Sequence, residues 1–207
     1  MYTEQILKEK MLENSIHIVD YLQYQNNLLL SNNKLTSINV SKNNDLTTLG
    51  LARNKLTSLD VSKNTKLETL DCGENKLSSL NVNNNSKLVK LYCYENSISS
   101  LDLSKNSALE IIDCDMNKLT NIDVSKNTNL VELVVYNNSL TSLDITKLTK
   151  LEHLDIEDTG ISSIDLSKNA NLKVLYCRNT KLSSINVYNT KLVDAVINPS
   201  DEEYPEN

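Results

Sequence analysis

Phenylalanine and tryptophan are absent from the 207 residues of this chain, which also holds only three glycines and two prolines. Its nine tyrosines are the only aromatic side chains, which excludes a core built on many large rings. Three scattered glycines exclude a glycine-rich phosphate-binding loop. No run approaches the roughly 18 to 20 apolar residues that a membrane helix needs, and the first residues carry charges where a signal peptide would be apolar. We therefore expect a soluble chain with no membrane insertion and no signal peptide in this sequence.

Basic residues are also too few for a protein that binds nucleic acid. The chain has 21 lysines and arginines against 27 acids, which gives a net charge of −6. Proteins that bind phosphate backbones generally carry a basic excess or a basic stripe, so we expect no nucleic-acid partner. The length fits one domain or one repeat array, and 39% hydrophobic residues are enough for an ordinary core.

The chain is dominated by an internal repeat of 21 residues. The unit reads L-x-x-L-x-C/L-x-x-N-x-L-x-x-L-D-V-S-K-N-x-x, and we number its positions from the leading leucine. Eight units run from Gln25, which stands in the first leucine position, to Lys191, and the eighth unit is one residue short. A ninth half-unit begins at Leu192. The leading leucines of the other seven units are Leu46, Leu67, Leu88, Leu109, Leu130, Leu151 and Leu172.

This motif resembles the leucine-rich repeat, in particular the 21-residue class of bacterial surface and secreted proteins. The resemblance covers about four-fifths of the chain and implies a right-handed solenoid. Physical reasoning agrees, because the apolar positions of one unit can be buried only when neighbouring units stack into a common core. The resemblance also implies a secreted or cell-surface location and a role in adhesion or host recognition.

The two halves of each unit are copies of one another, and both show apolar and polar residues in alternation. We therefore expect a fold between α/β and mainly β, with short parallel strands on both faces and no helices behind the sheet. Equal spacing of strands on both faces predicts a flat solenoid.

Three segments follow from this organisation. Residues 1–24 are predicted to form a partly helical N-terminal cap, because Ile6, Leu7, Met11 and Leu12 fall near helical spacing. Residues 25–198 form the solenoid, and residues 199–207 form an acidic tail in which Pro199 and Pro205 stop strand addition.

Buried polar and sulfur groups are expected at two positions of the unit. The asparagine at position 9 should turn inward and bond to backbone groups freed by the bend, while Thr159 and Thr180 at this position should hold their turns less well. Cys72, Cys93 and Cys114 recur at position 6, with Cys177 three units further on. Parallel side chains point the same way, so we expect stacked and reduced core thiols.

No constellation of residues indicates catalysis, a metal or another cofactor. His17 and His153 are the only histidines, and no nucleophile is placed to use them. Asp113, Asp115 and Asn117 begin like a calcium loop, but lysine follows where glycine is required, and Val124 stands where the loop needs a bidentate glutamate. We therefore predict a protein that is not an enzyme and has neither cofactor nor metal site.

The outward positions of the two halves differ in variability. The second half repeats serine, threonine, aspartate and lysine almost unchanged, whereas positions 2, 3, 5, 7 and 8 vary from unit to unit. From Leu46 to Lys191 these varied positions hold twelve acids and four bases, an excess of eight negative charges. The candidate partner-binding residues there are Asp71, Tyr92, Tyr94, Glu95, Asp113, Asp115, Glu132, Tyr136, Asp155, Glu157 and Tyr176.

These residues predict a monomeric module whose acidic face binds a partner protein that carries a basic patch. Tyrosine is enriched at interfaces, and an acidic field steers basic partners. Two alternatives remain open. One is a carbohydrate or cell-wall binding module in which the tyrosines stack on sugar rings. The other is a structural spacer whose tyrosines only reflect strand propensity.

Overall fold

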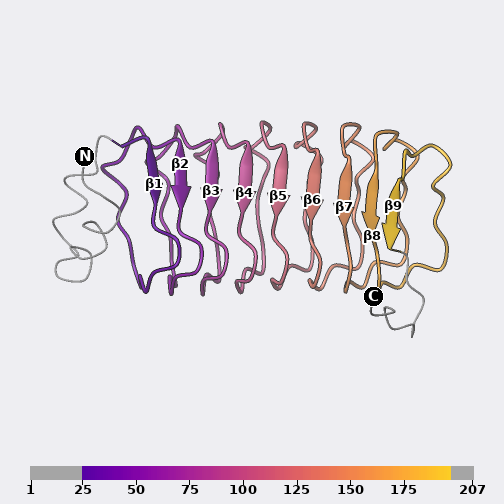
Figure 1. The fold of residues 1–207 in the computed structure, drawn as a ribbon, viewed down its shortest axis with the longest axis horizontal. Helices are drawn as coiled ribbons and strands as arrows, with labels where there is room; N and C mark the ends of the chain where they lie inside the picture. Colours follow the sequence, from indigo (N-terminus) through magenta and orange to yellow (C-terminus); the bar gives the residue numbers. More distant parts are fainter. Residues whose placement is uncertain (1–24, 197–207) are drawn as a thin grey trace, which may run out of the picture.

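The computed structural model describes residues 25–196, which form an elongated solenoid (Figure 1). One parallel sheet of nine three-residue strands runs along it in the order β1 to β9. The strands are β1 Asn27–Leu29, β2 Thr48–Gly50, β3 Thr69–Asp71, β4 Lys90–Tyr92, β5 Ile111–Asp113, β6 Glu132–Val134, β7 His153–Asp155, β8 Val174–Tyr176 and β9 Asp194–Val196.

The strands occupy positions 3 to 5 of successive units, so the number of each strand is also the number of its unit. The register pairs equivalent residues, as in Leu49 with Leu70 and Leu70 with Leu91. Between β8 and β9 it pairs Val174 with Asp194, one residue fewer than elsewhere, which confirms the shortened eighth unit. The central leucine of β2 to β8, or isoleucine in β5, is fully buried, while the flanking residues face outward.

The asparagines at position 9 bond as expected. In Asn75 the Nδ2 donates to the carbonyls of Leu51, Cys72 and Gly73 at 3.0 to 3.1 Å, while its Oδ1 accepts the N–H of Leu56 at 3.0 Å. Each such asparagine from the second unit onward therefore ties its own bend to the preceding unit. Thr159 replaces this set with one hydrogen bond, from its hydroxyl to the carbonyl of Ile156.

A second row of buried asparagines, which the sequence did not lead us to expect, lies at position 19. Asn106 is fully buried, and its Nδ2 donates to the carbonyls of Val82 and Asn85 in the preceding unit at 3.0 and 2.9 Å. Leu148 interrupts this row in the sixth unit and is equally buried. Members that share this pattern are Asn64, Asn85, Asn106, Asn127 and Asn169.

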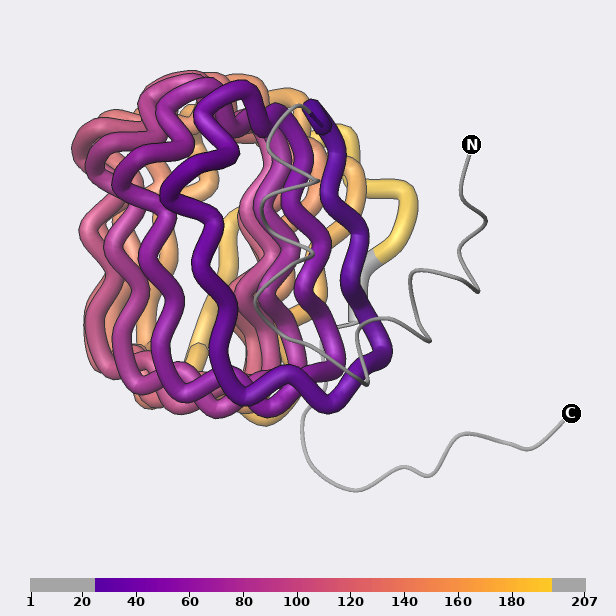
Figure 2. Tube along the Cα trace, turned by 90° about the vertical axis from the view of Figure 1, so that its left-hand side faces the viewer, coloured from indigo at the N-terminus to yellow at the C-terminus, as the bar shows by residue number. Residues whose placement is uncertain are grey.

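The prediction of strands on both faces is wrong. Seen along the long axis, the coils form two walls (Figure 2), but within residues 25–196 only the wall of positions 3 to 5 is a sheet. In the other wall, the aspartate or asparagine at position 15 accepts the N–H two residues later, as Asp123 does from Ser125 at 2.9 Å. Such local bonds compete with a ladder, and the asparagines at position 19 join the units instead. We expected a flat solenoid because strands on both faces would be equally spaced. With one sheet in residues 25–196, that reason no longer applies.

Helices are not found in residues 25–196, so nothing in this region supports an α/β mixture. The predicted helical cap at residues 1–24 and the acidic tail at 199–207 lie outside the described residues. In the described part no helix is long and apolar enough to cross a membrane.

The four cysteines are buried and free of disulfides, as expected for core thiols. Cys72, Cys93 and Cys114 follow one another in the third, fourth and fifth units. Burial raises the pKa of each thiol above its ordinary value. A raised pKa leaves little thiolate at neutral pH, so we assign these side chains to packing.

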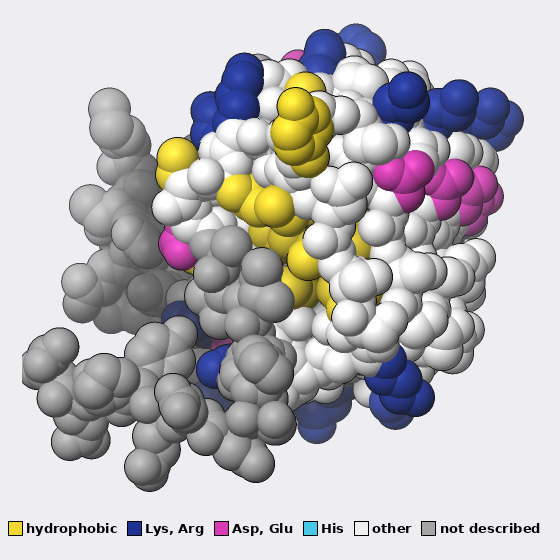
Figure 3. All heavy atoms as spheres, turned by 90° about the vertical axis from the view of Figure 1, so that its right-hand side faces the viewer, with side chains coloured by type: hydrophobic (Ala, Val, Ile, Leu, Met, Phe, Trp, Pro, Cys, Tyr) yellow, Lys and Arg dark blue, Asp and Glu magenta, His cyan; other side chains and the backbone are white. Residues whose placement is uncertain are grey.

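The end of the solenoid nearest β9 exposes apolar side chains (Figure 3). Tyr188 is 90% exposed and Val193 is 84% exposed, while Leu182, Ile185 and Leu192 are partly buried against the core. Burial thus decreases toward this end, as expected where stacking ends.

Position 8 has a left-handed backbone in every full unit, with φ between 47° and 59°. Asparagine and aspartate tolerate this conformation better than other non-glycine residues, yet Met116 adopts it with φ 47°. We expect Met116→Asn to raise the free energy of unfolding by about 0.5 to 1 kcal/mol because it relieves this strain. Urea denaturation would measure the change. Met116→Ala removes the side chain without relief, and equal stability of the two variants would contradict the explanation.

Candidate functional site

The sheet face, by which we mean the outward residues at positions 2, 3, 5 and 7, holds most of the candidate residues. Strands β3, β5 and β7 end in Asp71, Asp113 and Asp155 at position 5, while β4 and β8 end in Tyr92 and Tyr176. Position 7, just beyond the strands, holds Tyr94, Asp115, Tyr136 and Glu157. The parallel register sets each column of equivalent residues side by side along the solenoid.

Five carboxylates of this face are partly buried, and burial raises their pKa values. Burial is the largest cause for Asp113, whose pKa rises to about 6 with help from Glu132, Asp155 and Asp71. It is also the largest cause for Asp115, whose pKa rises to about 7 with help from Asp113, Glu95 and Asp155. The same cause raises the pKa of Asp71, Asp155 and Glu157. The acids therefore repel one another in a setting where water only partly compensates their charge.

The aspartates at position 5 also have a local role. Their Oδ1 atoms accept the backbone N–H at position 7, from Gly73 at 3.2 Å to Asp71 and from Glu157 at 3.0 Å to Asp155. The equivalent contact from Asp115 to Asp113 is 3.4 Å. These bonds turn the chain at the end of the strand, yet the tyrosines and valine of β4, β6 and β8 end their strands without them. The turn alone therefore does not require aspartate.

Tyrosine hydroxyls lie among these acids. Partial burial is the largest cause of the raised pKa of Tyr92, followed by the charges of Glu132, Asp113 and Asp71. For Tyr136, partial burial comes first, followed by Asp115 and Glu95. Tyrosines and acids thus form one surface.

Gly73 provides a place for the ring of Tyr94. It is buried at position 7 of the third unit, and a Cβ added there would overlap the ring atoms of Tyr94 in the fourth unit. The tyrosine side chain therefore lies over the glycine backbone. A larger residue at position 73 would displace this ring.

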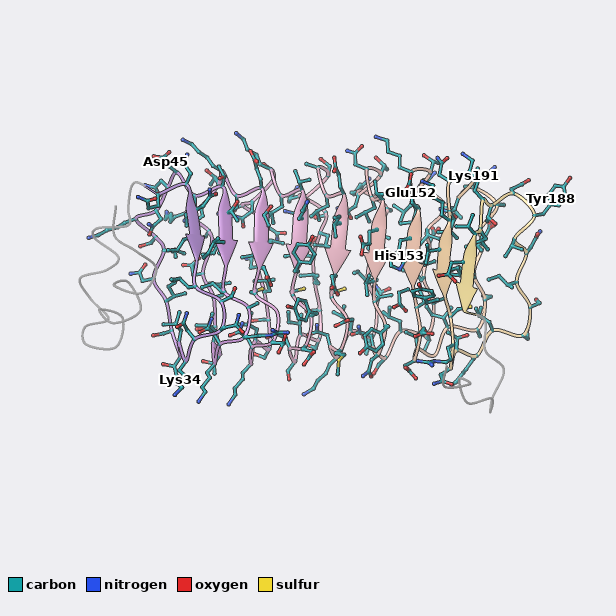
Figure 4. The ribbon with its side chains drawn as sticks, viewed as in Figure 1. Lys34, Asp45, Glu152, His153, Tyr188 and Lys191 are labelled. Carbon is teal, nitrogen blue, oxygen red and sulfur yellow. The ribbon has the colours of Figure 1, made fainter. Side chains whose placement is uncertain are left out.

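His153 begins β7 in the seventh unit and is the only histidine of the described residues. The Nδ1 of His153 lies 3.6 Å from Oε1 of Glu132 on β6, and its ring meets that of Tyr176 edge to face with centroids 5.5 Å apart. Figure 4 shows His153 on the strand and Glu152 nearer the strand's start. The hydroxyl of Tyr176 donates to Oδ2 of Asp194 at 3.1 Å. Glu132 and Tyr176 thus have partners within the protein.

Two other candidate acids differ in their surroundings. Glu95 is exposed at position 8, on the left-handed turn beside the face. The Oε1 of Glu157 lies 3.5 Å from Nε of Arg178, one of the four bases counted at the varied positions but not among the candidate binding residues. The sheet face is therefore most negative over the fifth to seventh units, and Lys173 and Arg178 offset it at the eighth.

Position 2 adds a column of acids that sequence reasoning counted as charge but did not assign to the site. Its residues are Glu68, Val89, Glu110, Val131 and Glu152 in units three to seven. The acids fall in the units that carry aspartate at position 5. Comparing this column in the same way as position 5 would have revealed it.

The opposite wall has the reverse electrostatic character. The exposed aspartates at position 15 have pKa values lowered chiefly by hydrogen bonds at position 17, as in Asp102, Asp123 and Asp165. Lys105, Lys126 and Lys168 follow three residues after them and lower the same pKa values further. Hydrogen bonds thus favour the charged form of these aspartates, whereas burial raises the pKa of Asp71, Asp113 and Asp155 on the sheet face.

No group of three or more histidine, cysteine, aspartate or glutamate side chains within residues 25–196 is arranged to hold a metal ion. Asp113 and Asp115 lie on the sheet face rather than around a common centre. What the face can do chemically is attract cations and present flat aromatic rings.

The repeat, the solenoid and the structures to which it is similar show that the chain is a leucine-rich repeat protein of the 21-residue bacterial class. No protein-family model and no curated protein sequence matches it. The functional domain of InlJ from Listeria monocytogenes is 33% identical with a TM-score of 0.68, over 82% of this chain and 43% of that domain. That domain includes a cysteine ladder, and Cys72, Cys93 and Cys114 are stacked here.

Two further solved structures are similar. A leucine-rich repeat protein of Leptospira interrogans is 25% identical with a TM-score of 0.62, over 78% of this chain and 51% of that one. Internalin C2 from Listeria monocytogenes has a TM-score of 0.78 at 24% identity, over 86% of this chain and 83% of that one, which shows the fold alone. The chain thus spans about half the length of the first two.

Proposed function

We propose that this protein is a non-catalytic module that binds a partner protein through the sheet face, in a bacterial surface or secreted protein engaged in adhesion or host recognition. Its similarity to internalin-type repeat proteins supports a protein-interaction module. The observation that carries the proposal is the contrast between the two walls. One wall repeats itself and satisfies its acids, whereas the other varies and holds half-buried carboxylates beside tyrosines.

Electrostatics and burial assign different parts to the two kinds of residue. The acids attract a basic surface from a distance and speed association. The tyrosines provide apolar area within a charged surround, as do the central residues of many protein interfaces. A partner that brings arginine or lysine to Asp113 and Asp115 also offsets the burial and the repulsion that raise their pKa values.

Binding variants test this assignment. We expect Tyr136→Ala to raise the dissociation rate, at a cost of about 1 to 3 kcal/mol in binding free energy. We expect the double change Asp113→Lys and Asp155→Lys to slow association, and this loss should shrink in high salt. A partner recovered with the wild-type protein and lost with the charge-reversed protein provides the ligand for these surface plasmon resonance measurements.

The controls lie on the opposite wall. Lys63 and Lys105 are exposed at position 18, and Lys63→Glu and Lys105→Glu should leave both rates unchanged. If these changes abolish binding and Tyr136→Ala does not, the binding wall is the repetitive one. Binding of sugars that persists in high salt would favour the carbohydrate-binding alternative, since stacking of sugars on tyrosine is not screened.

A further inference from the structure

The sheet face is striped across the solenoid axis. At position 5, aspartate on β3, β5 and β7 alternates with tyrosine or valine on β4, β6 and β8. At position 2, glutamate and valine alternate in step with it, in the same units. At positions 2 and 5, acids therefore recur on every second strand with apolar or aromatic residues between them, while Lys90 and Glu132 at position 3 add one charge each to the intervening rows.

The spacing of these rows follows from the sheet. Neighbouring strands lie about 4.8 Å apart, so acidic rows recur about every 9.6 Å along the solenoid. From β3 to β7 this makes three rows over about 19 Å. Any elongated ligand that follows the axis therefore meets negative charge at this fixed interval.

The central acids of the rows have no basic partner of their own. Among the ion pairs of the described residues, none includes Asp71, Asp113 or Asp155. Each accepts only the short-range backbone N–H at position 7. Arg53 near Asp71 and Arg178 near Asp155 lower those pKa values only partly, because burial still raises both overall. A partly buried carboxylate without an ion-pair partner gains from an added cation.

The rows between them offer flat rings. Tyr92 and Tyr94 lie in the fourth unit, and the ring of Tyr94 is laid over Gly73. Tyr136 belongs to the sixth unit, where Val134 replaces the position-5 tyrosine. Surfaces lined by aromatic rings are those on which proline-rich segments dock.

We propose that the sheet face binds a polyproline II segment with a basic residue at every third position, lying along the solenoid axis; this rests on the proposed function. A polyproline II helix rises about 3.1 Å per residue and has three residues per turn, so every third side chain repeats after about 9.3 Å. An extended strand repeats a face after about 6.6 to 6.8 Å. An α-helix repeats a face after seven residues, about 10.5 Å. Polyproline II fits the rows best.

In this arrangement arginine side chains reach the acidic rows at Asp71, Asp113 and Asp155. The two intervening residues of each triplet lie over the tyrosine rows, where proline rings pack on the aromatic faces. The segment's conformation is already extended when free, so little conformational entropy is lost on binding.

Synthetic peptides test the register directly. Fluorescence anisotropy would compare four repeats of Arg-Pro-Pro with four repeats of Arg-Pro-Pro-Pro, which have the same charge and conformation but place arginine about every 12.4 Å. We expect the first to bind about five- to ten-fold more tightly, since only it engages several rows at once. Four repeats of Glu-Pro-Pro should not bind.

Variants of the protein locate the contact. Asp113→Lys should abolish the preference between the two arginine peptides, and Gly73→Val should weaken binding of the first because it displaces the Tyr94 ring. Lys63→Glu on the opposite wall should change neither. Equal affinity for the two spacings overturns the register but leaves an acidic face that binds basic partners. Absence of binding to both peptides overturns the inference. Recovery of a partner with the wild-type protein, and its loss with the charge-reversed protein, still tests the proposed function.

Discussion

Asp115→Asn is expected to raise the free energy of unfolding at pH 8 by about 1 to 3 kcal/mol, a range reduced because the side chain is only partly buried. The pKa of Asp115 is about 7 in the folded protein and about 3.9 in an unfolded chain. Because the folded pKa is the higher one, this group favours the folded state fully below pH 4 and loses that contribution as pH rises through 7. Asparagine resembles the protonated acid, so the gain should vanish near pH 4. Urea denaturation at a series of pH values would measure it.

The opposite wall provides a matched control for this prediction. The pKa of Asp123 is lowered by its hydrogen bonds to Ser125, so its charge favours folding above the unfolded pKa and this contribution is lost in acid. Asp123→Asn keeps an acceptor, as Asn81 does at the same position, and should cause a small loss at pH 8. If Asp115→Asn also destabilises the protein at pH 8, the carboxylate is not in the unfavourable setting described.

Asn117→Ala is expected to lower the free energy of unfolding by about 3 to 5 kcal/mol. Its Nδ2 donates to the carbonyls of Cys93, Cys114 and Asp115, at 3.0, 3.2 and 2.9 Å, and its Oδ1 accepts the N–H of Ile98 at 2.9 Å. Alanine leaves the Ile98 N–H and these carbonyls short of a partner inside the bend, which is the costly case. Chemical denaturation measures the loss.

The chain contains the reverse experiment. Thr159 is buried at the equivalent position of the seventh unit and makes one hydrogen bond to a carbonyl. Thr159→Asn should therefore stabilise the protein by about 1 to 2 kcal/mol, because asparagine fits this bend in other units and supplies both donors and an acceptor. A neutral Asn117→Ala together with a destabilising Thr159→Asn would contradict this account of the asparagines.

The sheet wall could be predicted from the sequence because its determinants lie in the repeat. Leucine at position 4 between outward residues specifies the strand, and the 21-residue period specifies the register. The asparagine at position 9 was also predictable, since a polar residue inside an apolar repeat must bond to backbone groups. The stacking of Cys72, Cys93 and Cys114 was predictable because they recur at position 6 of successive units.

The second wall could not be predicted because its pattern has two interpretations. The alternation from Leu80 to Val82 matches that of a strand, but the Oδ1 of Asn81 accepts the backbone N–H of Asn83, two residues later. Asparagine at position 19 then joins neighbouring units through its side chain. Local side-chain hydrogen bonds compete with the backbone hydrogen bonds of a β-ladder, and the periodicity of the sequence does not show which of the two forms.

The composition of the candidate site was predictable, but its electrostatics were not. Position alone placed Asp113 and Asp115 on an outward face, where carboxylates are usually well hydrated. Their raised pKa values come from partial burial between neighbouring rows of side chains, which depends on the actual packing. Similarly, the packing of the Tyr94 ring against Gly73 joins two neighbouring units, so it depends on how the units stack.

The direction of the sheet's hydrogen bonds decides how residues 25–196 would respond to mechanical load. The bonds between strands run along the solenoid, so tension applied at its two ends pulls directly on them instead of shearing them. Coils would separate one at a time, beginning where the ties are fewest, at the bends of Thr159 and Thr180. Each released coil of 21 residues lengthens the chain by roughly 65 Å, so the module would extend stepwise under force.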